Sequence, residues 1–150
     1  MANSFLKVFI HYVFSTKNHE PFITSSLENK LWAYMASVAR EIDVEPLIIN
    51  GIEDHAHVLV SLPATITIAK AIQKIKGVSS LWVSKTFEEF SDFEWQVGYG
   101  AFSISHYDLN KTINYIKNQK EHHRTHSFKE EYIDLLKKNN IIYDEKYLWG

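Results

Sequence analysis

The sequence predicts an α+β fold with an antiparallel four-stranded sheet that carries its helices on one face. Segments with strand-like alternation and segments with helical spacing follow one another in the order β-α-β-β-α-β-α-α. That order is typical of a split βαβ, or ferredoxin-like, fold. The chain has 150 residues with only 5 Gly and 3 Pro, and no repeat or linker divides it. We therefore expect one domain over residues 1–150, with a tyrosine-bearing helix and a tail at its C-terminal end.

The first half of the chain should contain three strands and one helix. A Ser-x-x-Glu capping box at Ser25 and Glu28 favours a helix that ends near Glu41. The strands alternate apolar and polar side chains, and the last two have a short connection that suits a hairpin. These expected strands cover residues 5–14, 44–50 and 54–62.

The second half should contain three helices and the fourth strand. Thr67 can cap a helix that extends to Trp82 and could be interrupted at Gly77. Ser105 and Asp108 can form a capping box for the next helix. The remaining elements are a strand over 99–105 and a helix over 128–138.

Composition excludes several classes of protein. The formal net charge of −2 argues against non-specific coating of nucleic acid, although a local basic groove remains possible. Because the chain has no Cys, thiol catalysis and zinc ribbons are excluded, and a metal would need His, carboxylate, amide or water ligands. No apolar run approaches the ~20 residues that span a bilayer, and no export signal is evident, so we expect a soluble, cytoplasmic protein without membrane contact.

Two histidines share one face of an expected strand. Alternation places His55 and His57 on one face and the apolar Ala56 and Val58 on the other. Imidazoles two residues apart on a strand can bind one ion, although hydrogen-bonded surface histidines give the same pattern. Two histidines leave a metal site incomplete. The same alternation places Asp54 on the opposite face, away from both imidazoles.

A tyrosine and a glutamine lie one helical turn apart in the third helix. Tyr115 and Gln119 project from the same flank, away from the apolar stripe of Leu109, Ile113 and Ile116. Tyr115 either packs at the edge of that stripe or acts as a nucleophile toward a phosphodiester. The amide oxygen of Gln119 could be a third metal ligand.

Other polar side chains near the C-terminal end are not assigned to this site. The imidazoles of His122, His123 and His126 are typical of a helix end and a solvated surface. Tyr143 and Tyr147 are weaker candidates for a nucleophile because neither has a Gln one turn later.

Four segments together carry a family pattern: residues 11–17, 51–63, 76–80 and 115–124. They resemble the single-tyrosine HUH transposases of IS200-like bacterial insertion sequences, to which REP-associated tyrosine transposases are more distantly related. The combination of a His-hydrophobic-His strand with a Tyr-x-x-x-Gln helix, in this order, makes the resemblance specific. It implies that Tyr115 is the nucleophile. It also implies a divalent ion, Mg²⁺ or Mn²⁺, on His55, His57 and Gln119.

The resemblance further implies a reaction and its partners. The reaction is cleavage and rejoining of single-stranded DNA through a 5′-phosphotyrosine, on DNA with hairpins at the element ends. Family members are homodimers in which the tyrosine helix of one subunit can complete the histidine site of the other. A basic helix surface with a stacking tryptophan could contact DNA, although a solvated helix with that tryptophan in the core fits equally well. The residues of this surface are Lys70, Lys74, Lys85 and Trp82.

Two other functions remain open. A non-transposing relative that regulates by binding hairpin DNA or RNA would bind without forming a covalent adduct. A small histidine-metal hydrolase would use Tyr115 only as a hydrogen-bond donor. No carboxylate in the sequence stands out as the general base that such a hydrolase needs.

Overall fold

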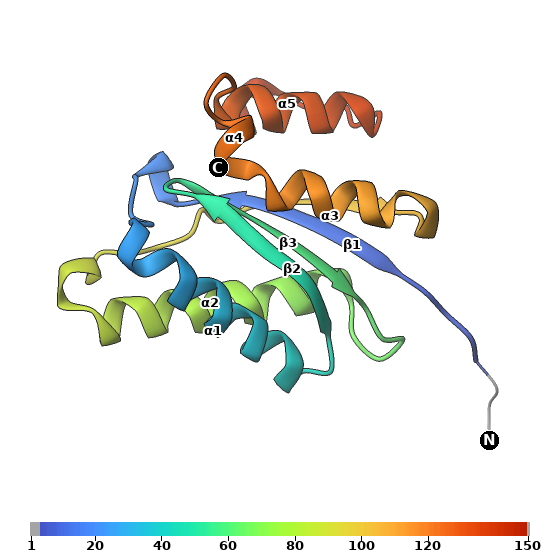
Figure 1. Ribbon diagram of the computed structural model, residues 1–150, viewed down its shortest axis with the longest axis horizontal. Helices are drawn as coiled ribbons and strands as arrows, with labels where there is room; N and C mark the ends of the chain where they lie inside the picture. The colour runs from blue at the N-terminus through green and yellow to red at the C-terminus, as the bar shows by residue number, and fades with distance from the viewer. Residues whose placement is uncertain (1–3, 150) are drawn as a thin grey trace.

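The computed structural model describes residues 4–149 and contains one four-stranded antiparallel sheet (Figure 1). The spatial order of the strands is β2-β3-β1-β4, and each neighbouring pair is antiparallel. This arrangement confirms the predicted ferredoxin-like topology. The strands are β1 (Phe9–Ser15), β2 (Glu45–Ile52), β3 (His55–Ser61) and β4 (Gly100–Ile104).

Helices cover both faces of this sheet (Figure 1). The first two helices lie on one face, as expected, and the tyrosine-bearing helix and its successors lie on the other. The helices are α1 (Ser25–Glu41), α2 (Ile68–Thr86), α3 (Leu109–Lys117), α4 (Gln119–His122) and α5 (Phe128–Lys138). Four 3-10 turns complete the described elements: η1 (Lys17–His19), η2 (Glu88–Phe90), η3 (His106–Asp108) and η4 (Glu145–Tyr147).

The main hydrophobic core fills the space between the sheet and helices α1 and α2. Alternate side chains of β3 enter it, including Ala56 and Val58, which is the face that the strand pattern predicted. Tyr12 and Phe14 of β1 lie in the same layer and are fully buried. Burial of each such large apolar side chain contributes about 1.5–3 kcal/mol to the hydrophobic stabilisation.

A smaller apolar cluster lies on the opposite face, between the sheet and α5. It contains Val13, Phe102, Phe128, Tyr132 and Leu136, all of which are buried. Because β1 is a central strand with helices above and below it, every residue of β1 is buried. Polar side chains that β1 and β3 send to this second face are therefore enclosed by protein.

Local contacts move three of the expected boundaries. The helix α1 has Thr24 as its N-cap, so Ser25 is already helical and does not form the expected capping box with Glu28. The Glu28 carboxylate instead accepts a hydrogen bond from Lys120 Nζ at 2.6 Å. The helix α2 passes through Gly77 without interruption. The hairpin turn lies at residues 53–54 instead of 51–53.

The expected third helix is divided in two at Asn118. Its backbone, with φ −99° and ψ 28°, ends α3 at Lys117, and α4 begins at Gln119. Asn50 of β2 contributes to this break, because its Nδ2 donates to the Ile116 carbonyl oxygen at 2.9 Å and ties the end of α3 to the sheet. Tyr115 and Gln119 therefore lie on two consecutive helices.

None of the helices in residues 4–149 has the length and hydropathy that a membrane crossing needs.

Candidate active site

Two strand histidines form the floor of the candidate site. His55 is the first residue of β3 and follows directly on the hairpin turn, and His57 lies two residues further along. Both imidazoles face away from α1 and α2, and both are fully buried, so they are not surface side chains. They lie beneath α4 and α5, on the face that the strand alternation predicted.

Each strand histidine is held from behind through its Nδ1 atom. Nδ1 of His55 lies 2.8 Å from Oδ1 of Asp54, and Nδ1 of His57 shares a 2.8 Å hydrogen bond with Nε2 of His11. The expectation that Asp54 faces away from the histidines is wrong, because Asp54 belongs to the turn, where strand alternation does not apply. Partners at Nδ1 orient both rings and direct both Nε2 atoms into the site.

The structure brings Gln119 to this site as expected. Its side chain is buried, and its Oε1 atom lies 3.0 Å from Nε2 of His55. The break at Asn118 does not separate Gln119 from the histidines, because α4 packs against β2, the strand that pairs with the histidine strand β3.

Two further residues enter the site that the sequence did not identify as site residues. Oε1 of Glu131, on α5, lies 3.2 Å from Nε2 of His55 and 3.0 Å from Nε2 of His57. His123 lies opposite, with its Nε2 3.1 Å from the same carboxylate oxygen and 3.1 Å from Oε1 of Gln119. One ligand atom from each histidine and from Glu131 lies within 4.8 Å of the others.

Tyr115 meets the same carboxylate from the α3 side. Its hydroxyl donates a hydrogen bond to Oε2 of Glu131, and Nε2 of Gln119 donates to that oxygen at 3.0 Å. The centroids of the Tyr115 and His57 rings are 5.7 Å apart. The structure therefore brings the expected nucleophile and the three expected metal ligands together around one glutamate.

Charge in the site is concentrated on Glu131 and His55. Burial alone would raise the pKa of Glu131, but hydrogen bonds from His123, His55 and His57 outweigh it and hold that pKa well below its usual range. Burial would lower the pKa of His55, but the hydrogen bonds with Asp54 and Glu131 outweigh burial and raise it to about 9. The metal-free site therefore contains an ionised carboxylate beside a protonated imidazole.

The neighbouring groups remain neutral. Burial lowers the pKa of His57 and holds that of His11 well below the usual value for an imidazole. Burial, together with the charge of Glu131, raises the pKa of the Tyr115 phenol far above 10. In the metal-free site, the Tyr115 hydroxyl therefore keeps its proton at neutral pH.

The donor set fits a divalent metal ion. The site brings together imidazole nitrogens, an amide oxygen and a carboxylate oxygen, which are suitable ligands for Mn²⁺ and related ions. The hydrogen bonds to His11 and Asp54 behind the rings are the outer partners that metal-binding histidines characteristically have.

A cavity of about 650 Å³ leads to Tyr115 between α3, α5 and β4. Its lining includes Lys111 and Lys138 as cations and Glu130 and Asp134 as anions. The cavity makes the tyrosine side of the site accessible from outside.

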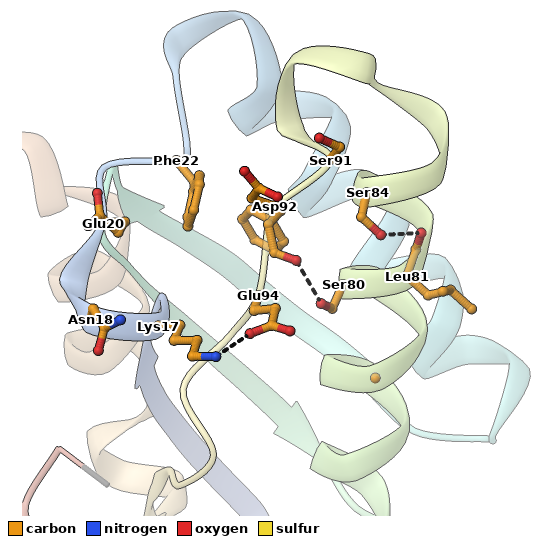
Figure 2. A pocket seen from close by; sticks show the side chains of 12 residues that line it. Lys17, Asn18, Glu20, Phe22, Ser80, Leu81, Ser84, Ser91, Asp92 and Glu94 are labelled. Carbon is orange, nitrogen blue, oxygen red and sulfur yellow. Dashed lines mark hydrogen bonds and ion pairs between the residues drawn. The ribbon is translucent and has the colours of Figure 1, made fainter.

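A separate cavity of about 630 Å³ lies between η1, α2 and the segment before β4 (Figure 2). Figure 2 shows that Lys17 and Glu94 point toward one another across it, and their Nζ and Oε2 atoms form a 2.9 Å ion pair. Because these charged groups satisfy one another and the histidine cluster does not line this cavity, we place the candidate active site at the histidines.

The expected DNA-contact residues lie on α2, on the opposite face of the sheet from α3, α4 and α5 (Figure 1). Lys70, Lys74 and Lys85 are exposed. Trp82 is half-buried, with its ring stacked on Tyr34 at a centroid distance of 4.2 Å. That packing covers one face of the indole.

The other two candidate tyrosines lie in the tail. Tyr143 packs against the apolar cluster on α5, and Tyr147 is 71% exposed. Tyr115 is the tyrosine whose hydroxyl contacts Glu131.

Comparison with known proteins finds chains of similar fold. A candidate transposase from Deinococcus radiodurans R1 has a similar structure, with a TM-score of 0.66 and 18% identity over 79% of this chain and 95% of that one. A REP-associated tyrosine transposase bound to a REP hairpin gives a TM-score of 0.59 and 14% identity over 82% of this chain and 73% of that one. No curated protein matches the sequence. The family model of IS200-like transposases matches residues 4–119, which confirms the resemblance inferred from the motifs: the chain belongs to the IS200-like transposase family.

Proposed function

We propose that this chain cleaves and rejoins single-stranded DNA through a covalent phosphotyrosine on Tyr115. The observation that carries the proposal is that Tyr115 and the strand histidines, which are distant in sequence, meet at one buried carboxylate. A phenol beside a cluster of metal-type ligands suits nucleophilic attack on a phosphodiester.

The proposed cleavage step exchanges one phosphoester bond for another. The Tyr115 oxygen attacks phosphorus, the bond between phosphorus and the 3′-oxygen breaks, and the phenolic proton ends on the released 3′-hydroxyl. Because the 5′-phosphotyrosine keeps the ester bond, a DNA 3′-hydroxyl can reverse the step without an energy source. The cavity between α3, α5 and β4 opens on the Tyr115 side chain and would give the DNA strand access to it.

The proposed metal ligands for this step are His55, His57 and Gln119. A bound Mg²⁺ or Mn²⁺ supplies positive charge to the phosphate oxygens and to the developing phenolate. The three ligand side chains have fixed positions in the fold, because the β3 strand carries both histidines and the α4 helix carries the glutamine. Their burial keeps bulk water from competing for the phosphate.

We further propose a DNA substrate with hairpins at the element ends and a homodimer as the working form. The hairpin proposal is supported by the similar fold of the transposase that is bound to a REP hairpin. The exposed lysines of α2, with Trp82 beside them, are the proposed contacts to the phosphate backbone. A single domain over residues 1–150 remains our prediction.

The test uses single-stranded oligonucleotides from the DNA that flanks the gene, incubated with the full chain and Mn²⁺. We expect the wild type to form a covalent adduct with the 5′ end of the downstream DNA fragment, visible as a shifted band in a denaturing gel. The Tyr115→Phe variant should form none. Tyr107→Phe is the matched control, because Tyr107 precedes the same helix and is 93% exposed.

The same assay distinguishes the competing functions. Retained hairpin binding without any adduct would reject strand cleavage in favour of a regulator. Turnover of a small phosphoester by Tyr115→Phe at the wild-type rate would favour a metal hydrolase. An adduct that survives Tyr115→Phe but disappears in Tyr147→Phe would reassign the nucleophile.

A further inference from the structure

Two side chains that the proposed function does not use lie against the strand histidines. Glu131 and His123 both follow residue 119, where the match to the transposase family ends. Each side chain is almost completely buried, with 1% of Glu131 and 4% of His123 exposed. Family membership alone does not explain why a carboxylate and a third imidazole are enclosed here.

Hydrogen bonds on the outer side of the rings determine which nitrogen faces the site. Nδ1 of His123 lies 2.6 Å from the carbonyl oxygen of His126, and a carbonyl can only accept, so Nδ1 carries the hydrogen. Nδ1 of His55 similarly donates to the Asp54 carboxylate. In the neutral form of each ring, Nε2 therefore directs a lone pair into the site.

These inward nitrogens all lie close to one carboxylate oxygen. Oε1 of Glu131 lies 3.0 to 3.2 Å from Nε2 of the three histidines. In the metal-free site a proton on an imidazole bridges such a contact, and a metal ion that binds the same lone pairs would replace that proton. Ligand atoms about 2.1 Å from one ion are separated by about 3.0 Å at octahedral right angles and by about 3.4 Å in a tetrahedron. The spacing around Glu131 falls in this range.

We propose that Glu131 and His123 are metal ligands alongside the two strand histidines. The segment after residue 119 then adds one imidazole and one carboxylate to the proposed ligands His55, His57 and Gln119. Such a set binds Mn²⁺ or Co²⁺ in preference to Mg²⁺, which prefers oxygen ligands. The purpose of this ion rests on the proposed function, but the binding itself is tested without DNA.

Two structural consequences follow from this ligand set. Because Glu131 belongs to α5 and His57 to β3, one ion fastens the C-terminal helix to the sheet. The other oxygen of Glu131 holds the Tyr115 hydroxyl, so the same carboxylate joins the ion and the proposed nucleophile. Loss of Glu131 should therefore loosen α5 from the sheet in the metal-bound protein.

The experiment measures metal binding to the full-length protein by calorimetry, with Mn²⁺, Co²⁺ and Mg²⁺ titrated separately. In the wild type we expect Mn²⁺ to bind at least about tenfold more tightly than Mg²⁺. Glu131→Gln and His123→Ala should each weaken Mn²⁺ binding at least about tenfold and change the visible absorption of bound Co²⁺. The metal-free melting temperature of each variant shows whether it folds.

Matched controls come from the same segment. Glu130→Gln changes the exposed neighbour of Glu131, and His126→Ala removes an exposed imidazole close to His123. Both should bind Mn²⁺ as the wild type does. A Glu131 or His123 variant that folds and keeps the wild-type affinity and Co²⁺ spectrum overturns the assignment of that residue.

This outcome is independent of strand cleavage. If Mn²⁺ binding depends on Glu131 and His123 but the wild type forms no DNA adduct, the metal site is supported and the proposed function is rejected. If the wild type forms a DNA adduct but neither variant changes the Mn²⁺ affinity, strand cleavage is supported and the assignment of Glu131 and His123 as ligands is rejected.

Discussion

His11 on β1 holds His57 on β3 from behind: Nε2 of His11 lies 2.8 Å from Nδ1 of His57, and the ring centroids are 5.1 Å apart. The register places the two residues on paired neighbouring strands, where His57 lies opposite Val13 and His11 lies opposite Leu59. The contact directs Nε2 of His57 toward Glu131. His11, which is not a proposed metal ligand, thus determines the orientation of the His57 ring.

We therefore expect His11→Phe to weaken Mn²⁺ binding by about 10- to 100-fold, because His57 loses the partner that fixes its ring. Phenylalanine is slightly larger than histidine and keeps an aromatic ring at this position, so the sheet should still form. Calorimetric titration with Mn²⁺ measures the effect, and His106→Phe, at an exposed position, is the control. Equal affinities for the two variants would show that His11 does not position His57.

Gly51 keeps the hairpin closed beneath the site. A Cβ atom at this position would lie 2.1 Å from the carbonyl oxygen of His55 and 3.0 Å from Cα of Ala56, and neither backbone atom can move alone. We expect Gly51→Ala to destabilise the fold by about 1–3 kcal/mol and to weaken Mn²⁺ binding by displacing His55.

The matched control for Gly51→Ala is Gly77→Ala. No atom of the described residues lies within 4 Å of a Cβ added at Gly77, which is in the middle of α2. Urea unfolding should show a gain of roughly 0.5–1 kcal/mol for this variant, since alanine is the better helix former. If both variants change stability in the same direction, the close contact at Gly51 is not the cause.

The sequence was sufficient to predict the sheet and most of the site because both depend on short-range periodicity. The two-residue alternation of β3 placed Ala56 and Val58 in the core and His55 and His57 opposite them, which the structure confirms. The one-turn spacing of Tyr115 and Gln119 predicted that their side chains lie together. Both contact Glu131, although the break at Asn118 puts them on separate helices.

The rest of the site depends on contacts that periodicity cannot show. Glu131 lies on an amphipathic helix, where a carboxylate is typical of a solvated face, and only the packing of α5 across the sheet encloses it. His123 is one turn after Gln119, a spacing that could have indicated the site but that also fits a helix end. Asp54 belongs to a turn, whose side chains follow no alternation.

The single chain supplies both halves of the proposed active site. Tyr115 lies against the histidines of its own chain, whereas a composite site would require α3 to move to a partner subunit. We therefore expect a mixture of His57→Ala and Tyr115→Phe chains, carrying tags of different size, to form no DNA adduct. An adduct on the His57→Ala chain would show that its tyrosine acts at the site of the other subunit.

Lys76 provides a pH-dependent contribution to stability away from the site. Its side chain is buried in α2, and its Nζ donates to the carbonyl oxygens of Gln96 and Gly98, each at 2.7 Å. Burial lowers its pKa from 10.5 to about 8. Between these two values the unfolded chain binds a proton that the folded chain lacks, so the free energy of unfolding should rise with pH.

We expect the stability of the wild type relative to Lys76→Met to increase by about 1–3 kcal/mol between pH 8 and pH 10.5, and to be independent of pH below 8. Urea unfolding at a series of pH values measures this difference. Lys74→Met is the matched control, because Lys74 is exposed on the same helix and its replacement should leave the pH profile unchanged. A difference between the wild type and Lys76→Met that stays constant over the whole range would mean that the folded protein binds the Lys76 proton as tightly as the unfolded chain does. The two carbonyl contacts would then fully offset the cost of burying the ammonium group.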